Sequence, residues 1–335
     1  MLQPYLTRST AGWYRGTADA IAQNWDWISS RGPRRLLVLS GDHVYRMDYR
    51  ALLHTHERRG AAATLAVTRV APDQSRRFGM ATLGRDGRIS ELEEKPERSE
   101  TPWANMGVYV FETEALGTYL ASQPVDLVLD VLRPMLAGAE RVFSHPFDGY
   151  WEDVGTLRSY YRANLELVAP SARLALHDPN WPLLTRDEER PPVRVGDGAR
   201  IEDSLVANGC RISGAVRRSV LFPGATVEAG ATVEDSVVMQ DVVVGPGAQV
   251  SRAILDKYAR VGPGAVVGAG EAPDDPALAW MDGLTLVGKD ARVPEGARIG
   301  RAAVVGIGAG PASFDGGELA AGRTMPSRPW YEELV

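Results

Sequence analysis

Two aspartates and a lysine of this chain stand where charged side chains could act on a phosphate or a metal ion. Asp42 follows the aliphatic run at residues 36–39, and a carboxylate in that place can hold a cation or a hydroxyl. Lys95 closes a later strand pattern, where its ammonium could meet an anion, and Asp153 stands just before a helix start at Thr156. Small molecules bind beyond the carboxyl ends of strands in open α/β sheets. We therefore expect the two carboxylates to face one crevice and to hold a metal ion.

Each of these candidates also has a purely structural interpretation. Asp42 could end its strand in a polar turn, and Lys95 could pair with Glu93 or Glu94 at the surface, where ion pairs are common and weak. The turn at residues 16–17 precedes an expected helix, and the free N–H groups of a helix start can receive a nucleotide phosphate. Most such turns only begin a helix. The residues alone leave these alternatives open.

The composition is that of a globular protein. The chain has 335 residues, of which 44% are hydrophobic, and its formal net charge is -6, so it has no overall attraction for nucleic acid or an anionic membrane. Cys210 is the single cysteine, which excludes a disulfide framework. No apolar run is long enough to span a membrane, and no secretory leader is evident. These features predict a soluble protein of the cytoplasm.

The elements that would position the candidate residues form an α/β domain. Residues 36–39 are four aliphatics in a row, which is typical of a strand buried on both faces of a parallel sheet. Asp48 and Gly60 bracket an amphipathic helix, and Thr156 can cap another. Further strands are expected at residues 63–70, 78–83, 88–93 and 105–111. The pattern predicts a mostly parallel, Rossmann-like sheet over residues 1–170.

From residue 193 the chain becomes periodic. Valines recur at intervals of six in pairs that repeat every seventeen residues, and the pairs are 227/233, 244/250 and 261/267. A second run keeps the same step at residues 287, 293, 299 and 305. Such repeats wind into a parallel β-helix whose aliphatics stack inward. We expect a linker at 171–192, a β-helix at 193–335 and a loop at residues 271–282.

Taken together, the motifs resemble the bacterial ADP-glucose pyrophosphorylases, or glucose-1-phosphate adenylyltransferases. The matching segments stand in the family's order, and they are 13–20 (WYRGTADA), 41–45 (GDHVY), 78–79 (FG), 94–96 (EKP), 106–111 (MGVYVF), 150–156 (YWEDVGT) and 180–182 (NWP). The resemblance implies a nucleotidyltransferase domain followed by a left-handed β-helix. It also implies synthesis of ADP-glucose and pyrophosphate from ATP and glucose 1-phosphate, for glycogen, in a homo-oligomer that would be a tetramer.

The resemblance assigns one set of residues to the nucleotide and the metal. Tyr14, Gly16 and Thr17 would line the nucleotide, and Asp42 and Asp153 would hold Mg²⁺. In-line attack of one phosphate on the α-phosphorus of ATP needs charge neutralisation and alignment rather than a protein nucleophile. Two carboxylates and a metal ion therefore fit the implied reaction.

A second set would bind the sugar phosphate. By the resemblance, Glu94 would accept hydrogen bonds from the glucose hydroxyls, and Lys95 would contact the phosphate and act in catalysis. Gly79, Asn105 and Trp151 would complete this side of the site. At position 105 the family commonly has serine, and asparagine keeps a hydrogen-bonding group there.

One departure bears on activity. The family's glycine-rich loop of the type G-G-x-G-x-R-L, whose N–H groups cradle the triphosphate, is not found in this sequence and is expected ahead of residue 1. A misassigned start, a fragment or a true loss would each explain this, and the chain alone is expected to have little activity. The alternatives are a related enzyme, such as a mannose-1-phosphate guanylyltransferase, and a non-catalytic regulatory or scaffold subunit.

Overall fold

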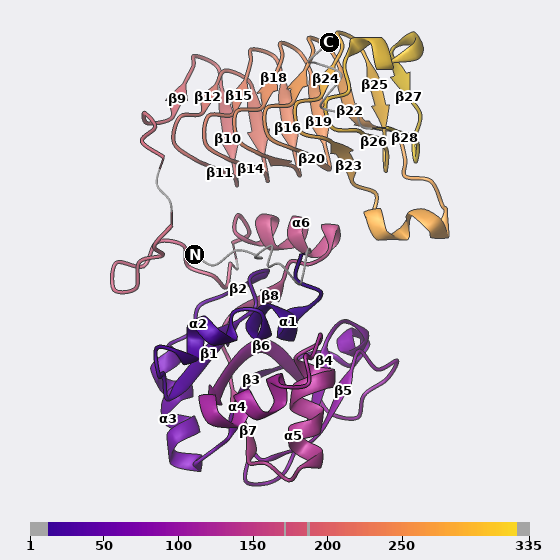
Figure 1. Cartoon of the computed structure of the whole chain (residues 1–335). Coiled ribbons are helices and arrows are strands. Elements are labelled where there is room, and N and C mark those ends of the chain that lie inside the picture. Colours follow the sequence, from indigo (N-terminus) through magenta and orange to yellow (C-terminus); the bar gives the residue numbers. More distant parts are fainter. Residues whose placement is uncertain (1–12, 171, 186–187, 327–335) are drawn as a thin grey trace. The chain divides into compact units, whose positions relative to one another are not determined.

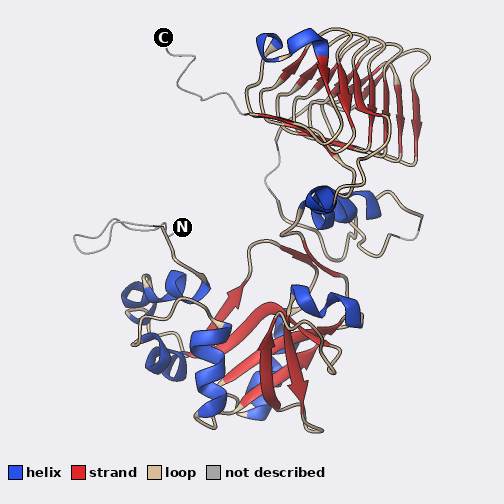
Figure 2. Cartoon of the chain, turned by 90° about the vertical axis from the view of Figure 1, so that its right-hand side faces the viewer, coloured by secondary structure: helices blue, strands red, loops and turns tan. Residues whose placement is uncertain are grey.

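The computed structural model describes residues 13–170, 172–185 and 188–326 (Figure 1). Its contacts divide the chain into two compact units, Met1–Trp151 and Glu152–Val335, which meet inside one short strand. No helix among the described residues is long and apolar enough to cross a membrane. The first unit is an α/β layer and the second is a stack of short strands (Figure 2).

The first unit is built on a six-stranded sheet of order β5-β4-β6-β3-β7, in which β1 also pairs with β6. Its strands are β1 (Arg35–Leu39), β3 (Ala63–Arg69), β4 (Gly79–Leu83), β5 (Ile89–Glu94), β6 (Trp103–Glu112) and β7 (Val142–Pro146). Among the described strands of this sheet only β3 and β7 pair in parallel, because β6 runs against β1, β3 and β4, and β5 runs against β4. The expectation of a mostly parallel sheet is therefore corrected, since the sheet is mixed.

The aliphatic run before Asp42 is also less central than expected. Strand β1 pairs with β6 alone among the described residues, its first four residues are half-buried, and Leu39 is 42% exposed. A strand with one neighbour buries less of its surface than a strand paired on both sides. Four consecutive aliphatics thus mark a strand here without marking full burial.

Helices cover both faces of this sheet. They are α1 (Thr17–Ala22), α2 (Trp25–Ser29), α3 (Tyr49–Arg59), α4 (Thr113–Leu120) and α5 (Arg133–Ala137), with the 3₁₀ turn η1 (Pro72–Arg77) and the π-helical turn η2 (Val128–Leu132). Alternate residues of a strand point to opposite faces, so Leu65 packs with α1, α4 and α5 residues while Ala66 packs with Leu52 of α3. The predicted caps of α3 are confirmed, because Asp48 accepts from the Arg50 N–H and Gly60 is left-handed.

A buried histidine ties α3 to the sheet. His56 has no exposed surface; its Nδ1 lies 2.9 Å from Thr64 Oγ1, and its Nε2 lies 3.3 Å from Glu112 Oε1. Burial lowers the pKa of His56, and its hydrogen bond with Glu112 opposes this shift only in part. The folded protein therefore holds a neutral imidazole.

This histidine should make stability depend on pH. Below about pH 6.5 His56 takes up a proton in the unfolded chain, whereas burial opposes protonation in the folded chain. The contribution of His56 to the free energy of unfolding is therefore fully present above about pH 6.5 and falls as the pH drops toward the lower folded pKa. We expect roughly 1 kcal/mol to be lost per pH unit within that window. Urea midpoints at pH 7.5 and 5.5 would measure the loss. His56→Gln should flatten the dependence and exposed His54→Gln should not, and an unchanged slope in His56→Gln would contradict the assignment.

The second unit is a parallel β-solenoid of three stacked sheets. One sheet contains β10 (Arg200–Glu202), β13 (Ala215–Arg217), β16 (Thr232–Glu234), β19 (Gln249–Ser251), β22 (Val266–Ala269), β25 (Arg298–Gly300) and β27 (Glu318–Leu319). The next contains β11 (Leu205–Val206), β14 (Val220–Leu221), β17 (Val237–Val238), β20 (Ala253–Leu255), β23 (Thr285–Val287), β26 (Val304–Val305) and β28 (Thr324–Met325). The third contains β9 (Arg194–Val195), β12 (Arg211–Ile212), β15 (Thr226–Val227), β18 (Val243–Val244), β21 (Arg260–Val261) and β24 (Arg292–Val293).

The periodic valines form the inside of this solenoid, as predicted. The six valines at 227, 233, 244, 250, 261 and 267 are each at most 2% exposed. Val227 pairs in register with Val244, and Val244 with Val261, so identical side chains stack from coil to coil. The predicted loop is also present, because the 3₁₀ turn η3 (Pro276–Met281) lies between β22 and β23. Two further 3₁₀ turns, η4 (Pro311–Ser313) and η5 (Asp315–Gly317), precede β27.

Helix α6 (Leu157–Glu166) belongs to this second unit. Thr156 caps it by accepting from the Ser159 N–H, as expected. Tyr161 packs against Val237, Ile254 and Leu284 of the solenoid, and its hydroxyl donates to the Asp235 carbonyl over 2.6 Å. The contacts divide the two units at residue 151, whereas the sequence pattern predicts a first domain that extends to residue 170.

Candidate active site

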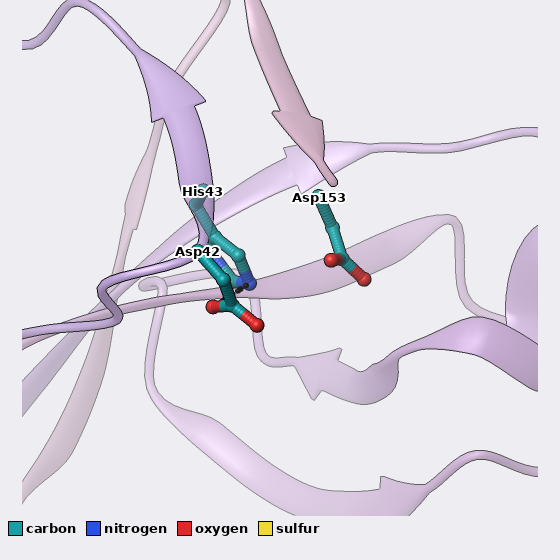
Figure 3. Close-up of side chains that lie close together, drawn as sticks. All are labelled: Asp42, His43 and Asp153. Carbon is teal, nitrogen blue, oxygen red and sulfur yellow. Dashed lines mark ion pairs between the residues drawn. The ribbon is translucent and has the colours of Figure 1, made fainter. Parts of the chain in front are cut away.

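The carboxylates of Asp42 and Asp153 lie side by side although 111 residues separate them in the sequence (153 − 42). Asp42 stands just before β2 (His43–Tyr45), and Asp153 ends β8 (Trp151–Asp153), which pairs with β2. Ligand atoms of Asp42, His43 and Asp153 all lie within 4.8 Å of one another, and Figure 3 shows both carboxylates reaching into the same space. The pairing of β2 with β8 thus brings these two aspartates together.

His43 supports this cluster from one side. Its Nδ1 lies 2.7 Å from the Met106 carbonyl oxygen, and its Nε2 lies 3.6 Å from Asp42 Oδ1. A carbonyl only accepts, so Nδ1 carries the proton and donates to it. The same nitrogen cannot then accept from Trp151 Nε1, which is 3.4 Å away. The indole instead packs edge-on against the imidazole at 5.3 Å between ring centroids.

The donor set fits a divalent cation. Carboxylate oxygens are the ligands that Mg²⁺ prefers, and it commonly takes only one or two of them and completes its shell with water and phosphate oxygens. The Asp42 side chain is 65% exposed, so water and a phosphate can reach it. Asp153 Oδ1 accepts from the Gly155 N–H over 2.7 Å, which fixes its direction. Asp42 and Asp153 are the residues that would hold the ion.

The expected sugar-side residues form a second group. An ideal Cβ on Gly79 would lie 3.0 Å from Glu94 Oε2 and 3.7 Å from the Asn105 Cβ, so these three residues adjoin. Burial raises the pKa of Glu94, and the neighbouring Lys95 ammonium opposes the shift. Trp151 packs against Phe78 at 4.9 Å between ring centroids, next to Gly79, and so stands between this group and His43.

Lys95 has an unusual backbone. Its φ is 47°, in the left-handed region that L-residues other than asparagine and aspartate rarely adopt. Its N–H donates to the Phe78 carbonyl over 3.1 Å, and its side chain is 62% exposed with Nζ 3.7 Å from Glu94 Oε1. The ammonium is therefore accessible to an anion, and strain of this kind is often found at functional positions.

The expected nucleotide-side residues lie in the turn before α1. Asn24 donates to the Tyr14 hydroxyl, and Thr17 Oγ1 accepts from the Leu127 N–H. The Ala18 N–H donates to the Val125 carbonyl over 2.9 Å, so this N–H is already occupied. A Cβ on residue 16 would lie 2.5 Å from that carbonyl oxygen, which explains why this position is a glycine. The helix start is thus used in part for packing.

The sequence reasoning missed several neighbours of these residues. His43 was overlooked because its only signal is its place after Asp42, and Tyr109 because it lies inside a buried strand. The Tyr109 hydroxyl accepts from Asn105 Nδ2 over 2.8 Å. The charge of Asp126 raises the pKa of Glu94, and Asp126 Oδ1 accepts from the Val128 and Leu129 N–H groups at the start of η2. An aspartate before a helical turn was the available signal for Asp126.

Comparison with known proteins agrees with this geometry. A family model described as nucleotidyl transferase matches residues 3–169, and a GlmU-like C-terminal hexapeptide model matches residues 193–287. A glucose-1-phosphate adenylyltransferase of Thermomicrobium roseum is 45% identical over 338 residues, covering 97% of this chain and 78% of its own length. Those of Acetivibrio thermocellus and Fervidobacterium nodosum are 37% and 36% identical, covering 91% of this chain and 74% and 75% of theirs.

Proposed function

Because the chain belongs to the glucose-1-phosphate adenylyltransferase family, we propose that it joins ATP and glucose 1-phosphate into ADP-glucose and releases pyrophosphate. The observation that carries this proposal is the convergence of Asp42 and Asp153, with ligand atoms within 4.8 Å. Such a pair suits a reaction that moves a nucleotidyl group between phosphates. ADP-glucose made in this way would serve glycogen synthesis.

The proposed reaction exchanges one phosphorus–oxygen bond for another. A phosphate oxygen of glucose 1-phosphate attacks the α-phosphorus of ATP, and the bond from that phosphorus to the bridging oxygen of the β-phosphate breaks, so pyrophosphate leaves. Mg²⁺ held by Asp42 and Asp153 would neutralise charge on the phosphates. The protein's own contribution is to hold the two substrates in line and to stabilise the charge that develops.

Each group of side chains has a part in this proposal. Glu94, with Gly79 and Asn105 beside it, would accept hydrogen bonds from the glucose hydroxyls, and Trp151 would close that side. Lys95 would contact the phosphate of glucose 1-phosphate, because its ammonium is exposed next to Glu94.

The ATP side of the proposal rests on the first turn of the chain. Tyr14, Gly16 and Thr17 would lie against the nucleotide, since the turn that holds them packs on residues 125–127, and the charge of Asp126 in that segment raises the pKa of Glu94. A homo-oligomeric state and a cytoplasmic location follow as expectations from the family resemblance.

Pyrophosphate release from ATP and glucose 1-phosphate tests the function. The assay should use the 335-residue chain and the product of its longest in-frame reading frame, since the chain covers 78% of the length of the Thermomicrobium roseum relative. The form that shows catalytic turnover is called the active form. We expect Mg²⁺-dependent turnover with ATP and glucose 1-phosphate, and much less with GTP and mannose 1-phosphate. A preference for the GTP pair would favour the guanylyltransferase, and no turnover by either form would favour a non-catalytic subunit.

A further inference from the structure

Strand β6 contains a bulge between the two groups of the site. Along β3, Leu65 pairs with Tyr109 and Val67 pairs with Asn105, so two steps on β3 correspond to four on β6. The extra residues include Gly107, whose φ is 67°. Bulges redirect side chains and are frequent beside active sites. We define residues 105–107 as the β6 bulge.

The bulge holds residues 40–43, which we call the Asp42 loop, at two points. The Ser40 N–H donates to the Gly107 carbonyl over 2.9 Å, and His43 Nδ1 donates to the Met106 carbonyl over 2.7 Å. These contacts lie on either side of Asp42 in the chain. A Cβ on Gly107 would stand 2.3 Å from Ser40 Oγ and 2.9 Å from His43 Cε1, so a side chain there would push this loop away.

The bulge also reaches the sugar side. Asn105 Oδ1 accepts from the Gly107 N–H over 3.1 Å, while its Nδ2 donates to the Tyr109 hydroxyl. Asn105 is 8% exposed and adjoins Gly79, which in turn adjoins Glu94. One short segment of backbone therefore contacts the support of Asp42 and the support of Glu94.

We propose that the β6 bulge sets the positions of both substrate-binding groups, with Gly107 and His43 as positioning residues that act through the Asp42 loop and touch no substrate themselves. The proposal rests on the proposed function for the identity of the ligands. It predicts that a change at Gly107 disturbs the metal and sugar sides together. A change at His43 should disturb the metal side alone, and only when the hydrogen bond to Met106 is lost.

The glycine test uses Gly107→Ala and, as a matched control, Gly32→Ala. Gly32 also has a left-handed backbone, with φ 58°, but an added Cβ there would meet nothing within 4 Å. We expect Gly107→Ala to weaken Mn²⁺ binding, followed by electron paramagnetic resonance, and glucose 1-phosphate binding, followed by calorimetry, each by about tenfold or more. Amide hydrogen exchange at residues 40–45, which needs no ligand, should accelerate. Effects equal to those of Gly32→Ala, or confined to one ligand, would overturn the proposal.

The histidine test separates positioning from direct ligation. In His43→Asn the amide nitrogen can replace Nδ1 as donor to Met106, whereas in His43→Gln the amide stands near the place of Nε2. We expect near-normal Mn²⁺ affinity in the asparagine variant and a loss of about tenfold in the glutamine variant. The reverse order would make Nε2 a ligand, and equal losses or no losses would remove the hydrogen bond as the cause.

Failure of the wild-type chain to bind glucose 1-phosphate would contradict the proposed function, while the Mn²⁺ and exchange comparisons would still decide the role of the bulge.

Discussion

Asp42→Asn and Asp153→Asn are each expected to remove most of the turnover of the active form while leaving its melting temperature within a few degrees of the parent. Either change takes away one negative charge from the pair that would hold Mg²⁺, and loss of such electrostatic stabilisation commonly costs about 100-fold or more in kcat. Stability should change little, because the Asp42 side chain is 65% exposed. The asparagine at 153 can still accept from the Gly155 N–H.

A matched control is available in the same chain. Asp274 is exposed in the loop between β22 and β23, so Asp274→Asn removes the same charge far along the sequence from the site. It should leave both kcat and the melting temperature unchanged. Pyrophosphate release at several Mg²⁺ concentrations and thermal unfolding by circular dichroism would make the comparison. Near-normal, Mg²⁺-dependent turnover in Asp42→Asn would contradict the assignment of Asp42 as a metal ligand.

Substitution of Lys95 is expected to act on one substrate. Removing an ammonium that pairs with a bound phosphate typically costs roughly 2–5 kcal/mol, or about 30- to 5,000-fold in affinity. The KM for glucose 1-phosphate should rise by a factor in this range, and the KM for ATP should hardly move. Steady-state kinetics with each substrate varied in turn would measure both constants.

The choice of replacement matters at this position because of its backbone. Lys95 has φ 47°, and asparagine tolerates that conformation better than alanine does. Lys95→Asn therefore removes the ammonium with less added strain, and Lys95→Arg keeps a positive charge as the control. If Lys95→Asn behaved like the parent while Lys95→Ala failed, the lysine would be needed for its backbone rather than for its charge. Equal effects on both KM values would likewise indicate a structural role.

The solenoid could be predicted from sequence because its signal is local and repeated. Successive coils carry inward valines at the same interval in the pairs 227/233, 244/250 and 261/267. The helix caps were equally readable, since Asp48 and Thr156 bond N–H groups two and three residues away. Strand direction in the first unit was not readable. An aliphatic run such as residues 36–39 marks a strand, whereas the burial and the neighbours of that strand are decided by packing over the whole domain.

The site shows the same limit. The residue pattern indicated the chemistry of Asp42, Asp153 and Lys95, because charged residues at strand ends are conspicuous, and the family resemblance added Glu94. It predicted that residues 42 and 153 face one crevice, but it did not show how they meet, because that depends on the pairing of two three-residue strands. The hydrogen bond from His43 to the Met106 carbonyl is a contact to backbone, for which no side-chain motif exists.

The loop between β22 and β23 shows how this chain can change in length. Val244 and Val261 are stacked partners 17 residues apart, yet the next partner of Val261 is Val293, which is 32 residues on. Fifteen additional residues (32 − 17) are thus accommodated with no shift in the register of the valines. A gain or loss of one residue within a strand would instead turn every later side chain of that strand to the opposite face. Insertions and deletions during the evolution of such a chain are therefore confined to the corners between strands or to entire coils.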